Sequence, residues 1–517
     1  MYKDKKVQPA TKITKQKKNI YPLGKKWLLL FGFLLILYLL IDYSSYLGIK
    51  PVVYILFVLG IIIPLINLRW GLFYYLTISL LSGDTSRILN SSHFISIHVT
   101  QLGQTTLITY LTIFIFLVAI SYFLIKKRKK IKITIIDQLI IAVVILYCIS
   151  GIIGLKNFLQ FSKYYISDAS YIINLVFIYF VIRLVITNKK QLKQLISLII
   201  LCFVVRSLVG IIYYYYGIGM PAGINVRTFY DSSRNLLPFI FFLCTLLALY
   251  LWKKISSGQK IILILFSLSA LFHIITFASR GNMIFTGIGI LLIILFLINR
   301  PLHIQKKILI KTTMFVILGI GLTLISVQII RPGALAYPEW KIKSLYEVNT
   351  DSAKLSSTSS RILEFKNIFN HLSTHNNLLW GEGLGGWFRD EYHPYVHKLL
   401  GGGAYPDKNI LERKIFKPHG SQFMILLKMG LGGLVIYYSL LMIIFIQSYK
   451  IFKKIKEPYY KAIALAITVF LPLLFYKNFI SKIQIFFGII LAILACINCF
   501  KSHIDKNYQK FKKKINY

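Results

Sequence analysis

The sequence predicts an all-α polytopic membrane protein with about 12–14 transmembrane helices and one large extracytoplasmic loop. Hydrophobic residues make up 56% of the 517 residues, charged residues make up only 15%, and the mean hydropathy is +0.66. Apolar runs that can cross a hydrocarbon core of ~30 Å, which takes about 20 helical residues, recur along most of the chain. Because a soluble fold cannot bury that much apolar surface, soluble multidomain architectures are excluded.

The apolar runs define about fourteen expected spans. The run at 71–82 is short and is open to a re-entrant interpretation, but without it the basic loops that follow would lie outside. The expected spans are 26–46, 51–68, 71–82, 103–125, 135–154, 169–187, 193–216, 235–252, 260–278, 283–298, 311–330, 420–447, 461–476 and 479–499.

The net charge of +44 gathers in short clusters between the apolar runs. Loops rich in lysine resist translocation and therefore mark the cytoplasmic side. When the spans alternate from a cytoplasmic N-terminus, every cluster falls in the cytoplasm, as do basic tails at 1–25 and 500–517. No basic-aromatic module accompanies the charge, which argues against a nucleic-acid partner. The clusters are 126–132, 189–193, 253–260, 306–307, 450–456 and 510–515.

The same alternation divides the chain into three membrane-related parts. Transmembrane helices 1–11 occupy 26–330, a large extracytoplasmic loop occupies 331–418, and the C-terminal transmembrane helices occupy 419–499. The loop holds nine of the seventeen acidic residues of the chain. Within it, apolar residues recur at helical spacing from Ile362 to Leu372, which predicts an amphipathic helix over 360–379 that can lie in the interface plane. A glycine-rich turn follows at 381–386. The smaller segments expected outside are 83–102, 217–234 and 279–282.

Four arginines are expected near the outer membrane surface. A guanidinium close to hydrocarbon is costly and persists where it binds an anion. Several arginines around one pocket suit a diphosphate, which accepts bidentate hydrogen bonds. The alternative for each arginine alone is snorkelling, or pairing with Asp231 or a lipid phosphate. The four are Arg227, Arg234, Arg280 and Arg361.

His419 ends the large loop and begins a span, so it is expected at the outer surface, where it can accept a proton from a sugar hydroxyl. The alternative is an interfacial histidine without a catalytic role. Two i, i+4 histidine pairs, His371 with His375 and His393 with His397, have metal-ligand spacing, but there is no H-E-x-x-H arrangement and we expect no metal. All five cysteines lie in apolar runs and are interpreted as packing residues.

Three stretches, taken in order, resemble the O-antigen ligase and polymerase superfamily of bacterial surface-glycan enzymes. The first is 279-SRGN-282 between two spans. The second is 360-SRILEFKNIFNHL-372, which leads to 379-LWGEGLGGWF-388. The third is 418-PHGSQFMILLKMGLGGLVIYY-438. The resemblance covers roughly residues 220–445, and the residue after His419 is Gly420, where the family often has Asn.

The resemblance implies a GT-C-like fold and a metal-independent inverting glycosyltransferase without a cofactor. Its donor is a polyprenyl-diphosphate-linked oligosaccharide and its acceptor a glycolipid or glycan, on the extracytoplasmic face of a bacterial cytoplasmic (inner) membrane. Arg280 holds the donor diphosphate, assisted by Arg227 or Arg234, and His419 acts as the general base or orients the acceptor hydroxyl. Ligase and polymerase stay open as alternatives. The rival from another class is a transporter, such as a lipid-linked oligosaccharide flippase, whose spans are expected to carry paired charges near the midplane.

Overall fold

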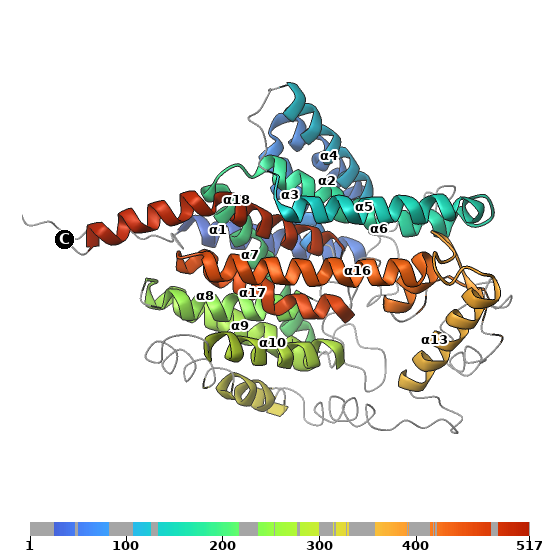
Figure 1. Cartoon of the computed structure of the whole chain (residues 1–517). Coiled ribbons are helices and arrows are strands. Elements are labelled where there is room, and N and C mark those ends of the chain that lie inside the picture. Colours follow the sequence, from blue (N-terminus) through green and yellow to red (C-terminus); the bar gives the residue numbers. More distant parts are fainter. Residues whose placement is uncertain are drawn as a thin grey trace, which may run out of the picture.

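The chain folds as a helical bundle in which most helices run roughly along one direction, while those at the top and at the lower right of the view are inclined to it (Figure 1). Our computed structural model describes residues 25–46, 50–81, 107–125, 133–216, 236–252, 254–276, 280–298, 314, 317–326, 328–329, 357–389, 391, 414–416, 418, 421–476 and 484–515. Over these residues the protein is almost entirely helical, as an all-α membrane protein requires. The bounds of the helices are α1 Lys25–Tyr46, α2 Lys50–Ile66, α3 Leu68–Leu81, α4 Leu107–Ile125, α5 Ile135–Ile153, α6 Leu155–Val185, α7 Lys189–Tyr216, α8 Leu237–Leu251, α9 Ser257–Thr276, α10 Arg280–Ile298, α13 Ser357–Thr374, α16 Ser421–Lys454, α17 Pro458–Tyr476 and α18 Gln484–Ile515.

Five helical segments in the described part of the chain are long and apolar enough to cross a membrane. Shorter apolar helices accompany them at most of the other expected spans. The prediction of a polytopic all-α membrane protein is therefore confirmed at the level of helix content and apolarity. The five segments are Ile135–Ile153, Tyr164–Val185, Lys189–Ile212, Ser257–Thr276 and Gln422–Lys454.

The short run at 71–82 forms α3, a helix of 14 residues that is largely buried. At 1.5 Å per residue its length is roughly 21 Å, less than the ~30 Å of a hydrocarbon core. The Asn67 side chain accepts hydrogen bonds from the backbone N–H groups of Arg69 and Trp70 and so caps the start of α3. A Cβ atom on Gly71 would lie 2.5 Å from Cα of Pro64, so glycine lets α3 fold back closely against α2.

The centre of the bundle is built from helices of the two halves of the sequence. Helix α18 packs on α6, and α17 packs on α8, α10 and α16. Leucine, isoleucine and alanine side chains of α17 and α18 are fully buried there. Small polar groups pair within this core: the hydroxyl groups of Ser448 and Thr468 lie 2.6 Å apart.

Two arginines that the sequence places inside spans have partners in the bundle. Arg183 of α6 forms a buried ion pair with Asp137 of α5, with Nε 2.9 Å from Oδ1, and the Tyr179 hydroxyl donates to the same carboxylate oxygen at 2.7 Å. Arg206 of α7 donates from Nη1 to the backbone carbonyl oxygen of Leu80 at 3.0 Å, near the end of α3. Both arginines therefore serve the packing of helices in this region.

The predicted terminal tails and large loop are described in part. Residues 1–24 lie outside the described residues, whereas 500–515 continue α18 as helix. In the loop at 331–418, the described residues form α13, a turn at 375–387 and a two-stranded antiparallel sheet. Its strands are β1 Phe388–Arg389 and β2 Lys414–Ile415. A helix, α13, does occupy most of the predicted range 360–379, but it starts at Ser357 and ends at Thr374, where the turn begins; it lies beyond the end of α16 in Figure 1.

Candidate functional site

The glycine-rich turn at 381–386 and the three residues before it, 378–380, are inserted between the corner where α5 meets α6 and the first part of α16. The N–H groups of Leu431 and Gly432 donate to the carbonyl oxygens of Leu378 and Leu379 at 2.9 and 3.0 Å. On the opposite side, the N–H of Leu384 donates to the carbonyl oxygen of Ser150 at 3.0 Å. Backbone hydrogen bonds thus connect the turn to two helices that are far apart in the sequence.

Glycine is required in this turn by both backbone conformation and space. Gly383 has φ +78°, and a Cβ atom on it would lie 2.2 Å from the backbone nitrogen of Gly154. Gly430 has φ +67° and interrupts α16, and a Cβ atom there would lie 2.3 Å from the carbonyl oxygen of Leu379. Since side chains other than glycine rarely adopt such φ values, these positions permit backbones to touch where a side chain would separate them.

A fully buried ion pair lies beneath the turn. Lys428 Nζ of α16 is 2.8 Å from Asp168 Oδ2 of α6, and the two side chains are 0% and 1% exposed. Asp168 Oδ2 also accepts the N–H of Gly385 at 2.9 Å, and Lys428 donates to the carbonyl oxygen of Gly386 at 2.5 Å. A buried charge is costly unless it is paired and hydrogen-bonded, and the turn supplies one bond to each partner. The turn and the ion pair therefore depend on each other.

Glu382 forms a second polar cluster on the outer side of the turn. Its carboxylate lies 3.1 Å from Lys156 Nζ and 3.6 Å from His371 Nε2, and it accepts a hydrogen bond from the Asn377 side chain at 2.8 Å. Burial alone would raise the pKa of Glu382, but these hydrogen bonds and the Lys156 charge outweigh it and hold the pKa at about 2. Asn157 donates to the carbonyl oxygen of Glu382 at 2.7 Å. The carboxylate thus stays ionised and connects α13 to the first turn of α6.

Helix α13 is attached to the start of α16 by an apolar contact. Ile368 and Leu372 of α13 are fully buried against Leu426 and Leu427 of α16, together with Phe388 of β1. Ile362, Phe365 and Phe369 belong to the same predicted apolar stripe and are 46%, 42% and 37% exposed, so the bundle covers only part of that stripe. The contact holds α13 beside the residues that follow His419.

Aromatic rings and two cations gather next to the bend in α6. Phe161 departs from helical geometry, with φ −136° and ψ 47°. The Phe416 ring stacks on Tyr164 at a centroid distance of 3.7 Å and lies 5.0 Å from the Phe161 ring. Lys414 Nζ and Arg389 Cζ lie 5.5 and 5.3 Å from the centroid of the Trp387 ring. This cluster joins the small β-sheet to α6 and completes the attachment of the large loop to the bundle.

Of the arginines and the histidine that the sequence predicts as site residues, only Arg361 has a described side chain. It is half-buried on α13, one turn before Phe365, whose ring lies 5.6 Å from Phe423 of α16. Arg280 is the first residue of α10, and its side chain is outside the described residues. The other three, Arg227, Arg234 and His419, also lie outside the described residues.

Two of the three stretches that carry the resemblance meet in space. The helix and glycine-rich turn of the second stretch pack against α16, which forms most of the third stretch. The first stretch opens α10, which packs on α17, α8 and α9. The described residues therefore bring α13, the helix of Arg361, against the helix that follows His419, and the side chain of Arg280 lies outside them.

Sequence reasoning missed the acidic partner in the core of this site. Asp168 falls just before the expected span 169–187, in the polar stretch 167-SDAS-170, and was not singled out. A usable signal was Lys428, because a lysine inside an apolar span needs an anionic partner. Only long-range packing identifies that partner, since Lys428 and Asp168 are 260 positions apart (428 − 168).

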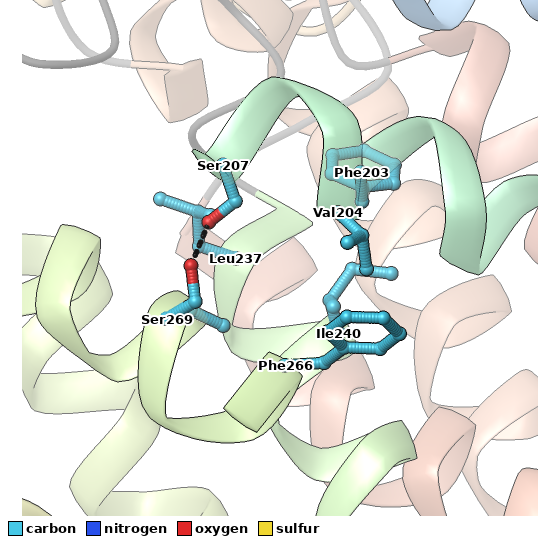
Figure 2. A pocket seen from close by; sticks show the side chains of 8 residues that line it. Phe203, Val204, Ser207, Leu237, Ile240, Phe266 and Ser269 are labelled. Atoms are coloured by element: carbon cyan, nitrogen blue, oxygen red, sulfur yellow. Dashed lines mark hydrogen bonds between the residues drawn. The ribbon is translucent and has the colours of Figure 1, made fainter. Parts of the chain in front are cut away.

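The histidine pairs and the small cavity offer less chemistry. The His371 and His375 rings lie 4.3 Å apart, and the described residues contain no group of three or more potential metal ligands. His393 and His397 lie outside those residues. Figure 2 shows a cavity between α7, α8 and α9, where the hydroxyl groups of Ser207 and Ser269 lie 2.5 Å apart. Its volume of about 10 Å³ has room for at most one water molecule.

No protein-family model matches the chain, and no curated protein sequence matches it significantly.

Proposed function

We propose that the protein is a glycosyltransferase of the O-antigen ligase or polymerase type. It moves a polyprenyl-diphosphate-linked oligosaccharide to a glycolipid or glycan acceptor on the extracytoplasmic face of a bacterial cytoplasmic membrane. The observation that carries the proposal is the seating of α13 and the glycine-rich turn on α16. This contact holds α13, which carries Arg361, against α16, which begins two residues after His419.

The proposed chemistry needs a positioned nucleophile and a stabilised leaving group. The leaving group is a polyprenyl diphosphate, and arginine suits it because the planar guanidinium donates two hydrogen bonds to phosphate oxygens. Arg280 is assigned to the diphosphate, with Arg227, Arg234 and Arg361 as further donors. His419 removes the proton from the acceptor hydroxyl, which attacks the anomeric carbon and displaces the diphosphate.

The test is transfer activity of the purified protein in liposomes. The donor is a polyprenyl-diphosphate oligosaccharide, supplied with a glycolipid acceptor or with none. Transfer to the glycolipid supports a ligase, and a ladder of longer lipid-linked products without it supports a polymerase. Arg280→Ala and His419→Ala are expected to lower either activity by roughly 100-fold or more, the scale of a lost general base or charge donor.

Matched controls come from segments that are expected on the cytoplasmic side of the membrane, opposite the proposed site. Arg128→Ala removes an arginine from the basic cluster at 126–132, and His503→Ala removes a histidine from the end of α18. Both control variants are expected to retain activity. Equal losses in all four variants, or full activity in Arg280→Ala and His419→Ala, would refute the assignment.

The rival proposal is a transporter for the same lipid-linked oligosaccharide. The buried pairs Asp137–Arg183 and Asp168–Lys428 favour it, because paired charges inside spans are typical of transport proteins. However, Asp137 lies in the first turn of α5 and Arg183 in the last turn of α6, away from the middle of either helix. Donor that crosses the liposome bilayer while no product forms would favour the transporter.

A further inference from the structure

The level of the membrane surface can be counted along the helices that hold the glycine-rich turn. A hydrocarbon core of ~30 Å takes about 20 helical residues. Counted back along α16 from Lys450, where the lysine-rich end begins, this length reaches Gly430. Counted forward along α5 from its first residue Ile135, it reaches Gly154. Both glycines therefore mark the surface of the leaflet opposite the lysine-rich ends.

Helix α6 gives a third and independent count. From its last residue, Val185, about 20 residues lead back to Ile166. The glycines of the turn touch all three helices at these levels, so that the turn lies in one plane with the membrane surface. The backbone contacts are those of Gly381 with Gly430, of Gly383 with Gly154 and of Gly385 with Tyr165.

Large apolar side chains are exposed at this level, or within about two helical turns beyond it, on both sides of the turn. Leu379 and Trp380 are 55% and 54% exposed, beside α16, and Leu155 and Leu159 are 54% and 86% exposed, in the first turns of α6. Such side chains on a soluble surface would face water at a cost. An indole ring favours the boundary between hydrocarbon and headgroups.

The exposed residues beside α16 continue a surface that already faces lipid. Leu379 accepts the N–H of Gly432 at its carbonyl oxygen, and its side chain lies next to Gly432, which Val435 follows about one helical turn later along α16. Val435 is 65% exposed and lies about one turn inside the counted boundary at Gly430. The apolar surface of the span thus runs without interruption into the turn.

We propose that Leu379–Trp380 and the segment Leu155–Leu159 insert into the lipid interface of the leaflet opposite the lysine-rich ends, and that their partner is the phospholipid surface itself. The large loop is then held by the bilayer as well as by the bundle. The ion pair of Asp168 and Lys428 lies at the same level, shielded from lipid by the turn. This inference depends on the span count, the glycine contacts and the exposed side chains, and it stands whether the protein is a transferase or a transporter.

Depth measurement by electron paramagnetic resonance tests the insertion. Single cysteines at Trp380 and Leu159 are spin-labelled in a variant whose five native cysteines are replaced, and the protein is reconstituted in phosphatidylcholine–phosphatidylglycerol liposomes. Val435→Cys provides a hydrocarbon reference and Ser373→Cys, at the exposed end of α13, an aqueous reference. The measured quantity is the ratio of collision rates with oxygen and with a water-soluble nickel complex.

At Trp380→Cys and Leu159→Cys the ratio is expected to exceed that at Ser373→Cys several-fold and to stay below that at Val435→Cys. Ratios equal to the Ser373→Cys reference would overturn the proposal, because the turn would then stand clear of the bilayer. Low collision rates with both reagents would also overturn it, because a second protein copy and not lipid would then cover the surface. If one labelled variant fails to fold, the other gives the same reading from the opposite side of the turn.

Discussion

The ion pair between Asp168 and Lys428 shows how a single charge can organise a contact between distant segments. Both partners are fully buried, and each makes one further hydrogen bond with the glycine-rich turn: Asp168 accepts the N–H of Gly385, and Lys428 donates to the carbonyl oxygen of Gly386. Removing one partner leaves an uncompensated buried charge, whereas removing both leaves two neutral groups of similar shape. The pair therefore predicts strong coupling between the two positions.

Asp168→Asn and Lys428→Met are each expected to destabilise the protein by roughly 3–5 kcal/mol, the usual cost of breaking a buried pair. The double variant is expected to recover most of this loss. Thermal unfolding in detergent, followed by tryptophan fluorescence, measures all three against the wild type. If the losses of the single variants simply add in the double variant, the two residues are not coupled.

Glu382 predicts a dependence of stability on pH. Its pKa in the folded protein, about 2, lies below the ordinary value of 4.5, so the ionised carboxylate stabilises the fold above about pH 4.5. This contribution is lost as the pH falls from about 4.5 towards 2. The melting temperature of the wild type is therefore expected to fall more steeply over this range than that of Glu382→Gln. Glu391→Gln, at an exposed carboxylate, is the control and should follow the wild type.

At the scale of single residues, the sequence indicates which side chains are unusual but not what they contact. Arg183, Arg206 and Lys428 are recognisable as charges inside apolar spans. Their partners are an aspartate on the neighbouring helix, a backbone carbonyl oxygen and an aspartate 260 positions away (428 − 168). Such pairings are set by the packing between helices. The order of residues along one helix does not reveal which residues of another helix will lie beside it.

Helix α13 is the element that most directly joins the large loop to the bundle. Its buried face contacts α16 through Ile368 and Leu372. Ile368→Ala is expected to weaken this contact by about 2–5 kcal/mol through the cavity that it leaves. Hydrogen exchange should then accelerate at the amides of α13 while those of α17 stay protected. Ile362→Ala, on the exposed face, is the matched control; faster exchange in both variants, or in α17 as well, would contradict a local opening.

At the scale of elements, periodicity and apolar length predicted most helices but not where they bend. Helix α6 was expected from residue 169 and begins at Leu155, because its first turns carry mixed polar and apolar residues that lie beyond the span. The bends at Phe161 and Gly430 lie where these helices contact the large loop, through Phe416 and Leu379. The glycines of 381–386 were recognisable as a turn, but its insertion between α5 and α16 was not.

For the whole molecule, the alternation of spans predicts which loops share a side. Cysteines at Ser92 and Ser256, in the expected outer segment 83–102 and the basic cluster 253–260, separate the two sides. In intact cells of the expression host, a membrane-impermeant maleimide is expected to label Ser92→Cys at once and Ser256→Cys only after permeabilisation. Labelling of both before permeabilisation, or the reverse order, would contradict the topology. The cysteine-free parent provides the background.

The insertion of the glycine-rich turn also has a consequence for how the protein is made. Ser150, whose hydroxyl donates to the carbonyl oxygen of Lys428, precedes it by 278 positions. Asp168, which accepts the N–H of Gly385, precedes it by 217 positions. At about 5–20 residues per second, a ribosome takes roughly 10 to 60 seconds to synthesise such a stretch. During that time the corner of α5 and α6 is already in the membrane with its polar groups unmatched. We therefore expect membrane chaperones and quality-control proteases to bind newly made α5 and α6 until α16 has been synthesised and packed against them.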